Sequence, residues 1–311
     1  MRILITGSRG FVGGSMGRFA AAANHQVLGV GRSGQPEVDW PGDYLQADVA
    51  TADLSKVIRD FAPELILHAA GTASVSGSFE APLDDLRASA ITWANTLEGV
   101  RRSGIKPLVI FPSSAAVYGN QLQLPIHESA VIAPISPYGF HKAACELLAR
   151  EYAACFGLQI MVCRIFSLLG EAQRRLLIWE MYRQFTELES TIWLQGTGTE
   201  SRDYLHVDGF AMALLELTGK RQQVFEQSPC LIINIASGVE TKALEVARQM
   251  RDIIAPEKTI RCRNIERPGD PRFWRADIDL LRSLLPSWNP RPFSSSLARC
   301  IATWQMPGKL R

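Results

Sequence analysis

The sequence has little net charge and lacks several features that would assign it at once to a class of protein. Its 311 residues include 33 Lys and Arg against 31 Asp and Glu, a net charge of +2, and no basic run exceeds two residues. A protein that binds nucleic acid or a membrane surface needs a basic footprint, so we expect neither partner. No apolar stretch approaches the roughly 18 residues that span a bilayer. Only three apolar residues follow Met1 and Arg2, too few for a secretory signal.

Disulfide and zinc motifs are absent as well. The six cysteines, at positions 145, 155, 163, 230, 262 and 300, show no C-x-x-C spacing and no histidine at a distance typical of zinc sites. We interpret them as free thiols of a reducing compartment, and we predict a cytoplasmic protein without a bound metal. Hydrophobic residues make up 47% of the chain, which excludes wholesale disorder.

Short apolar runs alternate with helical patterns along the chain. Near-continuous apolar runs are typical of parallel strands, because helices cover both faces of such a sheet. The pattern predicts an α/β fold with a doubly wound, Rossmann-type parallel sheet and a smaller mixed α/β C-terminal substrate region. We expect strands at residues 2–6, 26–29, 65–69, 108–111, 159–166 and 231–235, and helices at 12–24, 54–61, 83–103 and 138–157.

A glycine-rich loop joins the first predicted strand to the first helix. Glycines at three of its positions allow a tight turn, close approach of a pyrophosphate and close packing of the helix on the strand. The helix N-terminus adds N–H donors and a partial positive charge. The loop therefore predicts a dinucleotide site that includes Gly7, Arg9, Gly10, Phe11, Val12 and Gly13.

The end of the second strand bears on the choice of cofactor. NAD-binding proteins usually place an acid there to accept from the ribose 2′-hydroxyl, but residues 27–33 contain none. Arg32, together with Arg9, is placed to hold a 2′-phosphate; the alternative is that both arginines are solvated. We favour NADP(H), with NAD(H) as the alternative. Asp48 and Val49, between the second strand and the helix expected at 54–61, either meet the adenine or form an ordinary strand end.

The chain divides into two interleaved parts by its pattern. Residues 1–165 form the dinucleotide-binding part, and a returning segment at 207–236 supplies a further strand to it. Beyond residue 166 aromatic residues and Arg are more frequent, and Pro-rich turns appear. Residues 166–206 and 237–311 are therefore assigned to the substrate-binding part.

Tyr138 and Lys142 supply the clearest signal of chemistry. Residues i and i+4 share a helix face, and a Lys ammonium beside a phenol favours the phenolate. Such a Tyr exchanges a proton with a hydroxyl or carbonyl near neutral pH. Ser114 ends the preceding strand, at the edge where doubly wound sheets bind ligands, and its hydroxyl is placed to hydrogen-bond the same substrate oxygen. Taken alone, these features are more often a solvated helical pair and a Ser-rich turn.

Six short motifs occur in order along nearly the whole chain. They are Thr6–Gly13, His68-Ala69-Ala70-Gly71, Ser113–Gly119, Tyr138–Lys142, Arg202–Asp208 and Arg267-Pro268-Gly269-Asp270. Together they resemble the motifs of the extended short-chain dehydrogenases/reductases, and more narrowly those of the nucleotide-sugar epimerase/dehydratase group. By the resemblance, the C-terminal part binds a nucleotide-diphosphate sugar.

The resemblance implies roles for single residues. Ser114 and Tyr138 match residues that contact the sugar hydroxyl, and Lys142 matches one that binds the nicotinamide ribose and tunes the Tyr. The cofactor is also expected to contact Asp48, Val49, Ala69, Ala70 and Gly71.

At the nucleotide end, Arg202 and Arg267 match arginines that bind the diphosphate, which suits the fork of a guanidinium. Asp270 matches an acid that contacts the nucleotide ribose, and Ser167 lies where the family places a substrate-binding Asn. Trp274 is more readily explained as core, although its position near Arg267 suits the nucleotide pocket.

Departures from the family pattern narrow the reaction. The 4,6-dehydratases carry an Asp-Glu pair directly after the active-site Ser or Thr, and this chain has Ala115 and Ala116 there, so dehydration is not expected. Ser167 and Ser89 each stand where an Asn is common, which changes the substrate contacts. The resemblance then implies an NAD(P)-dependent 4-epimerase that acts through a 4-keto intermediate. The alternatives are an NADPH-dependent reductase of a nucleotide-linked 4-keto-6-deoxyhexose and, less favoured, a non-catalytic cofactor sensor.

The two long predicted helices bear on assembly. Residues 83–103 and 138–157 match the helices that pair across a dimer in this family. The resemblance therefore predicts a homodimer, whereas their apolar residues alone are explained by packing on the protein's own sheet.

Overall fold

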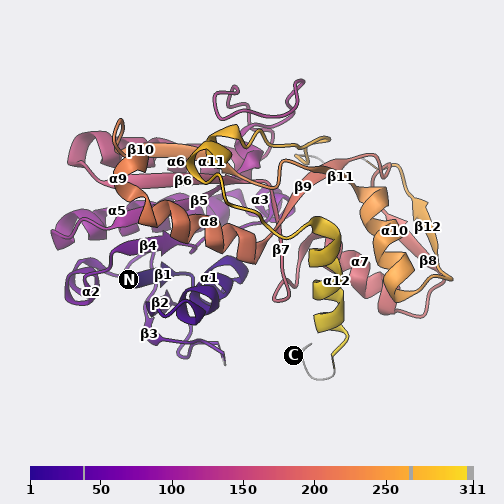
Figure 1. Ribbon diagram of the computed structural model, residues 1–311, viewed down its shortest axis with the longest axis horizontal. Coiled ribbons are helices and arrows are strands. Elements are labelled where there is room, and N and C mark those ends of the chain that lie inside the picture. The colour runs from indigo at the N-terminus through magenta and orange to yellow at the C-terminus, as the bar shows by residue number, and fades with distance from the viewer. Residues whose placement is uncertain (38, 266–268, 307–311) are drawn as a thin grey trace.

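The apolar runs of the first half of the chain, together with one run near residue 230, form a single sheet. The computed structural model describes residues 1–37, 39–265 and 269–306. In the sheet every neighbouring pair of strands is parallel, in the order β10-β6-β5-β4-β1-β2-β3 (Figure 1). The predicted Rossmann-type sheet is thus confirmed. Its strands are β1 (Arg2–Thr6), β2 (Gln26–Gly31), β3 (Asp43–Gln46), β4 (Leu65–His68), β5 (Leu108–Ser114), β6 (Gln159–Ile165) and β10 (Cys230–Ile235).

Two hydrophobic layers cover the sheet, because successive residues of a strand point to opposite faces. In β1, Ile3 and Ile5 belong to the cluster on one face, and Leu4 belongs to the cluster on the other. All three side chains are fully buried. The first face is covered by α1 (Phe11–Ala22) and α8 (Val207–Gly219), and the second by α2 (Ser55–Phe61), α5 (Thr92–Ser103) and α6 (Pro137–Phe156).

The helix predicted as one element over 83–103 is interrupted. It consists of α4 (Pro82–Leu86), a π-helical turn η1 (Arg87–Ile91) and α5. The hydroxyl of Thr92 donates to the carbonyl oxygens of Ala88 and Ser89, which satisfies backbone acceptors within the wide turn. Hydrophobic periodicity does not detect such a side-chain bond, so the prediction missed the turn.

Strand β5 is longer than its apolar run. The apolar run predicts a strand at 108–111, and β5 continues beyond it through Ser114, which pairs in register with Ile165 of β6 and ends the strand as expected for this residue. Backbone pairing with β6 thus outweighs the polar character of Ser113 and Ser114. The extension carries Ser114 to the carboxyl edge of the sheet.

The smaller C-terminal region is mixed, as predicted. It contains a three-stranded sheet and a two-stranded sheet packed around a separate hydrophobic cluster. The three-stranded sheet comprises β7 (Ser167–Leu169), β9 (Ser201–His206) and β11 (Glu240–Lys242), and the other comprises β8 (Thr191–Leu194) and β12 (Thr259–Cys262). Helices α7 (Leu176–Thr186), α10 (Ala243–Ile254) and α12 (Phe293–Trp304) pack around them at one end of the molecule (Figure 1).

The short elements connect these layers: α3 (Val75–Glu80), η2 (Ala115–Val117), α9 (Arg221–Val224) and α11 (Asp279–Leu284). All six cysteines lie in the described part of the chain and carry free thiols. Over the same residues, the helices are each too short or too polar to cross a membrane.

A partly exposed ionic cluster around the buried His206 joins α12 to the start of α8. The carboxylate of Glu171 accepts from the Nε2 atom of His206 (3.2 Å) and forms an ion pair with Arg299, which also donates to Asp208 (3.1 Å). The indole N–H of Trp304 donates to the carbonyl oxygen of Glu171 (2.8 Å). Burial opposes ionisation of Glu171, yet the His206 hydrogen bond and the Arg299 charge lower its pKa from 4.5 to about 2.

Replacing Glu171 by Gln is expected to lower stability in a pH-dependent way. A carboxylate with a lowered folded pKa contributes stability above its unfolded value of 4.5 and loses it as the pH falls towards about 2. At about 1.4 kcal/mol per pKa unit, and allowing for partial exposure, Glu171→Gln should cost about 2 kcal/mol at pH 7. Urea unfolding at pH 7 and at pH 3 measures the free energy of unfolding at both values.

The exposed Glu257→Gln variant is the matched control, and it should unfold like the wild type at both pH values. A Glu171→Gln penalty as large at pH 3 as at pH 7 would show that the ion pairs of this carboxylate do not hold α12 in place.

Candidate functional site

The carboxyl ends of β1, β4 and β5 meet at one edge of the sheet, because these three strands are parallel and adjacent. The segment after β1 is the glycine loop, the segment after β4 begins with Ala69, and β5 ends at Ser114. The predicted cofactor and catalytic residues of these three segments therefore share one edge, where ligands bind in open α/β sheets.

The glycine loop is packed tightly against the segment that follows β4. Gly7 has a left-handed backbone (φ +67°), and a Cβ added there would lie 2.5 Å from the carbonyl oxygen of Ala69 and from the amide nitrogen of Ala70. A Cβ on Gly13 would lie 2.4 Å from the carbonyl oxygen of Gly7. Gly10 precedes α1 without a side-chain cap, so no side chain at the N-cap satisfies the first amides of this helix. Phe11 and Val12 form the first turn.

The arginines predicted to face a 2′-phosphate are exposed. Arg9 donates from Nη1 to the carbonyl oxygen of Gln35 (3.2 Å), which lies in the loop after β2. Arg32 is exposed at the end of β2, and its carbonyl accepts from Gln46 (3.3 Å). The structure thus places both guanidiniums at the surface around the end of β2.

The candidate adenine contacts after β3 have local functions. The carboxylate of Asp48 accepts from the amide of Ala50 (3.0 Å) and so stabilises a turn. Val49 is buried, and its carbonyl oxygen accepts from the side-chain amide of Asn95 (2.7 Å). Asn95 also donates to Ala52 (2.8 Å), which fixes this turn to α5.

Tyr138 and Lys142 lie on the first turns of α6. This helix starts at Pro137, and the hydroxyl of Ser136 caps it by accepting from Gly139 (3.2 Å). The ammonium nitrogen of Lys142 lies 5.7 Å from the centre of the Tyr138 ring. The spacing of four residues thus places a cation beside the phenol, as predicted for a shared helix face.

The Lys142 ammonium reaches the strand that ends at Ser114. It donates to the carbonyl oxygen of Pro112 (2.9 Å) and lies 4.7 Å from the centre of the Phe111 ring. The exposed fractions of Ser114, Tyr138 and Lys142 are 8%, 8% and 7%, so all three side chains are largely shielded from water. The structure therefore gathers a hydroxyl, a phenol and a cation at one edge, a set able to exchange a proton with a substrate oxygen.

A buried histidine behind this site was part of a motif but not a predicted site residue. The Nδ1 atom of His68 lies 3.1 Å from the hydroxyl of Thr6 and 3.0 Å from that of Thr96. Burial, reinforced by the charge of Lys142, lowers the pKa of His68 to about 3. His68 is therefore neutral at physiological pH, and Lys142 supplies the positive charge beside the phenol.

A buried ion pair supports the end of β5, and sequence reasoning missed it. Ser113 donates to the carboxylate of Glu146 (2.6 Å), which also accepts from Arg164 (2.7 Å). Although burial opposes its charge, the Glu146 carboxylate raises the pKa of Arg164. Glu146 lies about two helical turns after Tyr138, so both residues share a face of α6. This shared face is the sequence signal that could have placed Glu146 near the site.

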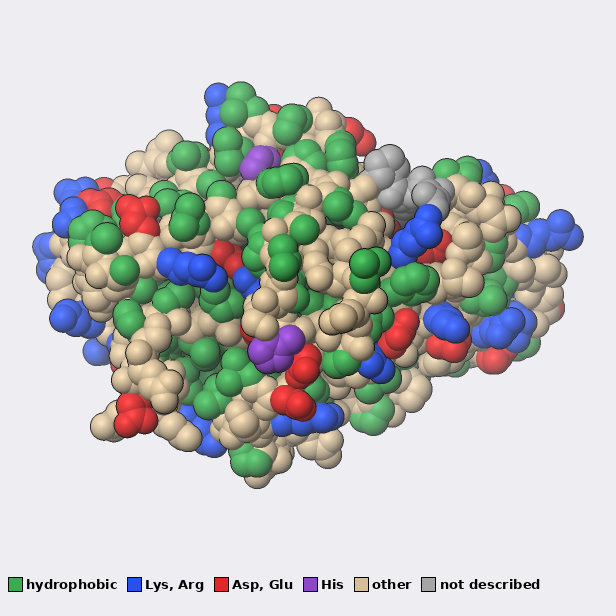
Figure 2. All heavy atoms as spheres, turned by 90° about the horizontal axis from the view of Figure 1, so that it is seen from above, with side chains coloured by type: hydrophobic (Ala, Val, Ile, Leu, Met, Phe, Trp, Pro, Cys, Tyr) green, Lys and Arg blue, Asp and Glu red, His purple; other side chains and the backbone are tan. Residues whose placement is uncertain are grey.

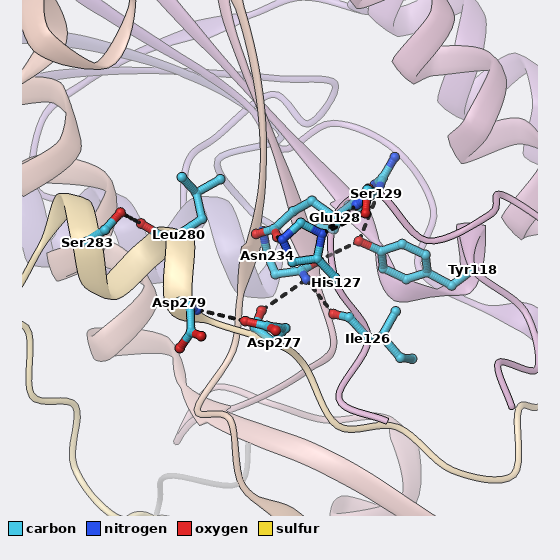
Figure 3. A network of polar contacts seen from close by, with 11 residues as sticks. Tyr118, Ile126, His127, Glu128, Ser129, Asn234, Asp277, Asp279, Leu280 and Ser283 are labelled. Carbon is cyan, nitrogen blue, oxygen red and sulfur yellow. Dashed lines mark hydrogen bonds and ion pairs between the residues drawn. The ribbon is translucent and has the colours of Figure 1, made fainter. Parts of the chain in front are cut away.

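The network continues from Arg164 to the segment that leads into α6. Arg164 donates to the hydroxyl of Tyr118 (2.9 Å), which donates to the side chain of Asn234 (2.7 Å). Asn234 in turn donates to the carbonyl oxygens of Ile126 (2.9 Å) and Asp277 (3.1 Å), as Figure 3 shows. Burial raises the pKa of Tyr118 to about 12, so it remains a neutral donor. Asn234 of β10 thus joins Tyr118 to the segments that contain Ile126 and Asp277.

The segment between Gly119 and Ser136 crosses the upper side of the molecule in Figure 1. Figure 2 shows that face, with hydrophobic side chains across its middle and many Lys and Arg toward its two ends. The segment exposes the large hydrophobic residues Leu122, Val131, Ile132 and Ile135.

The predicted nucleotide-binding residues are partly brought together. Arg202 of β9 forms an ion pair with Asp270, and its guanidinium lies 5.0 Å from the centre of the Trp274 ring. Ser167 opens β7 and pairs in register with Tyr204, on the strand that carries Arg202. Arg267 lies outside the described residues.

Among the described residues, the ligand atoms of Glu171, His206 and Cys300 lie within 4.8 Å of one another. The Nδ1 atom of His206 accepts from the amide of Asp208 (3.1 Å), so Nε2 carries the proton and faces Glu171. Burial also raises the pKa of Cys300 to about 12. A metal ion would need Nε2 and the thiol deprotonated, so these groups suit an internal ion-pair cluster rather than a metal site.

Comparison with known sequences gives one family. A family model described as the NAD dependent epimerase/dehydratase family matches residues 3–251. A putative UDP-glucose 4-epimerase of Methanocaldococcus jannaschii is 27% identical over 97% of each chain. A GDP-6-deoxy-D-mannose reductase of Pseudomonas aeruginosa is 27% identical over 93% of this chain and 98% of its own.

Comparison with solved structures agrees on the fold. MoeE5 in complex with UDP-glucose and NAD aligns with a TM-score of 0.86 over 98% of each chain, at 24% sequence identity. At 24% identity this similarity shows a shared fold and does not show a shared site.

A methyl group at Gly7 is expected to damage the loop far more than one at a free left-handed glycine. Gly104 has a similar backbone (φ +74°) with no atom within 4 Å of an added Cβ, so Gly104→Ala bears the conformational cost alone, about 1 kcal/mol. Gly7→Ala adds the clash with Ala69 and Ala70 and should cost at least about 2 kcal/mol.

Urea unfolding and NAD titration measure the two effects. Only Gly7→Ala should weaken NAD binding, because Gly104 follows α5, away from the glycine loop. Equal losses of stability and unchanged NAD affinity in the two variants would contradict the assignment of this loop to the cofactor.

Proposed function

The chain belongs to the NAD-dependent epimerase/dehydratase family, and we propose that it epimerises a nucleotide-linked hexose at C4. The observation that carries the proposal is the buried Lys142 ammonium, which lies beside the Tyr138 ring and is bonded to the strand that ends at Ser114. The epimerase relative supports the reaction class. Ala115 and Ala116 follow Ser114 without a titratable group, which argues against dehydration.

The residues at this edge fit a nicotinamide dinucleotide. The space at Gly7 and Gly13 is too small for a Cβ, and the uncapped start of α1 offers amide donors to a pyrophosphate. Gly10, Phe11 and Val12 would complete that seat. The nicotinamide end would be held by Tyr138, Lys142, Ala69, Ala70 and Gly71. When bound, the nicotinamide supplies a reversible acceptor for hydride.

The protein's own residues manage the proton at the C4 oxygen. Lys142 stabilises the phenolate form of Tyr138 by its charge, and this phenolate takes the proton of the C4 hydroxyl as the C4–H bond is broken, which leaves Tyr138 as a neutral phenol. Ser114 donates a hydrogen bond to the same oxygen. Once the 4-keto sugar presents its other face, Tyr138 returns the proton to the oxygen, and the configuration at C4 is inverted.

The smaller region would hold the nucleotide. Arg202 is the described cation best placed for the diphosphate, with Asp270 and Trp274 beside it. We also propose that Arg267 binds the diphosphate, that Asp270 contacts the nucleotide ribose and that Ser167 contacts the substrate. We accordingly propose that residues 1–165 and 207–236 bind the cofactor and that residues 166–206 and 237–311 bind the nucleotide sugar.

A reductase of a nucleotide-linked 4-keto-6-deoxyhexose is the second candidate. The same three side chains would serve it, with Tyr138 donating its proton once to the carbonyl oxygen. The acid-free end of β2 favours this candidate, because Arg32 suits NADPH, and so does the relative named as a reductase. The preference for NADP(H) over NAD(H) is a proposal from Arg9 and Arg32, whereas the likeness to MoeE5 with NAD favours NAD(H).

We also propose a homodimer. Helices α4 and α6, with η1, expose large hydrophobic side chains that the protein's own sheet does not cover. The exposed fractions are 55% for Leu83, 49% for Ile91, 59% for Phe140 and 68% for Leu147. Such a patch suits association with a second copy through these helices.

Tyr138→Phe is expected to lower kcat by about 100- to 10,000-fold, since the proton acceptor is lost while the ring remains. NAD binding should stay near that of the wild type. Tyr152→Phe is the matched control on the same helix, because the Tyr152 hydroxyl lies at the long distance of 3.4 Å from Glu98, away from the site. Full activity of Tyr138→Phe would refute the mechanism.

Product analysis separates the two candidate reactions. For an epimerase, we expect UDP-glucose and UDP-galactose, or another pair of 4-epimers, to interconvert without net consumption of cofactor. A reductase would instead consume NADPH in proportion to an added 4-keto sugar.

The cofactor released from the purified protein tests Arg9 and Arg32. We expect NADP(H), and Arg32→Ala should weaken NADP binding by about 10-fold while leaving NAD binding unchanged. Identification of released cofactor by mass spectrometry, with titrations of both nucleotides, measures this. Tightly held NAD and no effect of Arg32→Ala would rule out a 2′-phosphate site.

A further inference from the structure

A buried carboxylate beside the site belongs to none of the predicted motifs. Asp85 of α4 has a side chain only 3% exposed, and it lies 2.5 Å from the Nδ1 atom of His141, whose side chain is 16% exposed. The other carboxylate oxygen accepts from the hydroxyl of Thr72. Burying a carboxylate destabilises the folded state unless the charge is paired and hydrogen-bonded, so Asp85 depends on its contacts with His141 and Thr72.

The pair connects two segments on which the proposed reaction depends. Thr72 directly follows the segment 69–71 at the end of β4, which is the proposed seat of the nicotinamide. His141 directly precedes Lys142 on α6. Asp85 therefore bridges the cofactor segment and the helix that carries the proton-transfer residues.

The π-helical turn η1 contributes to the same contact. Its residue Ser89 is 2% exposed, and its hydroxyl lies 3.3 Å from that of Thr72. Thr72 is thus held between Asp85 and Ser89 on the α4 side of the site. Single π-helical turns are frequent at functional sites, where they change the direction in which side chains point.

Contact with His141 also fixes the rotation of α6. Successive residues are about 100° apart around a helix, so a side chain held at 141 determines where the side chain at 142 points. Tyr138 lies three residues before His141, on the neighbouring part of the same face. The backbone of Tyr138 is fixed as well, because its amide N–H donates to the hydroxyl of Ser78 in α3 (3.1 Å).

We propose that Asp85 and His141 are positioning residues that hold the segment 69–71 in register with Tyr138 and Lys142. The proposal rests on the proposed function, since it assigns the segment to the nicotinamide end of the cofactor. Asp85 and His141 act through their neighbours and touch neither substrate nor cofactor.

Three variants test the pair. His141→Ala removes the contact with Asp85, whereas His141→Asn keeps an N–H donor close to the position of Nδ1. Asp84→Ala is the matched control, because Asp84 is the neighbouring acid on α4 and its exposed carboxylate pairs only at 3.6 Å with Arg87. For each variant we would measure kcat and KM for the nucleotide sugar, the dissociation constants of NAD and NADP, and the thermal midpoint.

His141→Ala should lower kcat by about 10- to 100-fold and weaken NAD binding several-fold, with KM for the nucleotide sugar within about 2-fold of the wild type. His141→Asn should recover most of both losses, and Asp84→Ala should behave like the wild type. A split of this kind would not follow from a general loss of packing, which lowers the thermal midpoint first.

Two results would overturn the proposal: unchanged kcat and NAD affinity in His141→Ala, or equal losses in His141→Ala and His141→Asn. If the wild type turns over no nucleotide sugar, the proposed function fails. The positioning role is then decided by NAD affinity alone, which should still fall in His141→Ala and recover in His141→Asn.

Discussion

The hydrogen bond from the Lys142 ammonium to the carbonyl oxygen of Pro112 joins helix α6 to the interior strand β5 (2.9 Å). An ammonium that is only 7% exposed needs acceptors, and this one finds a neutral carbonyl and the faces of Phe111 and Tyr138. A neutral acceptor holds the cation in place without cancelling its charge. The charge therefore remains available to the phenol, as the proposed proton exchange requires.

The carboxylate of Glu146 lies near Lys142 but is paired with other groups. Glu146 lies one turn after Lys142 on the same helix, but its carboxylate is bound by Arg164 and by the hydroxyl of Ser113. Breaking one partner from such a buried pair would leave the other charge uncompensated, so the arrangement is rigid. The same network extends through Tyr118 to β10, so the sheet itself keeps α6 and the end of β5 in register.

Sequence patterns predicted the features that depend on residues close together in the chain. Apolar runs located six strands of the large sheet but not β3, whose sequence is mixed, and the spacing of Tyr138 and Lys142 indicated their shared helix face. Beyond its apolar run β5 pairs with β6 as far as Ser114, and in the turn η1 the hydroxyl of Thr92 donates to two backbone carbonyls; neither feature has a periodic signal in the sequence. The partners of Glu146 and Asp85 lie on other elements, and only the folded chain brings them together. Arg9 was singled out from the glycine motif as a phosphate ligand, whereas in the folded chain it donates to the carbonyl oxygen of Gln35 at the surface. The motif alone does not predict this contact.

The central claim is that this site removes and returns the same hydrogen at C4 while Tyr138 manages the proton on the oxygen. The most direct measurement uses the nucleotide hexose that the protein turns over, labelled with deuterium at C4, in ordinary water. Mass spectrometry and NMR of the product over many turnovers locate the label. The account predicts that both 4-epimers retain deuterium at C4, because the hydrogen leaves and returns as hydride, which does not exchange with water. Loss of the label to solvent, or formation of a single product with net oxidation of cofactor, would contradict it.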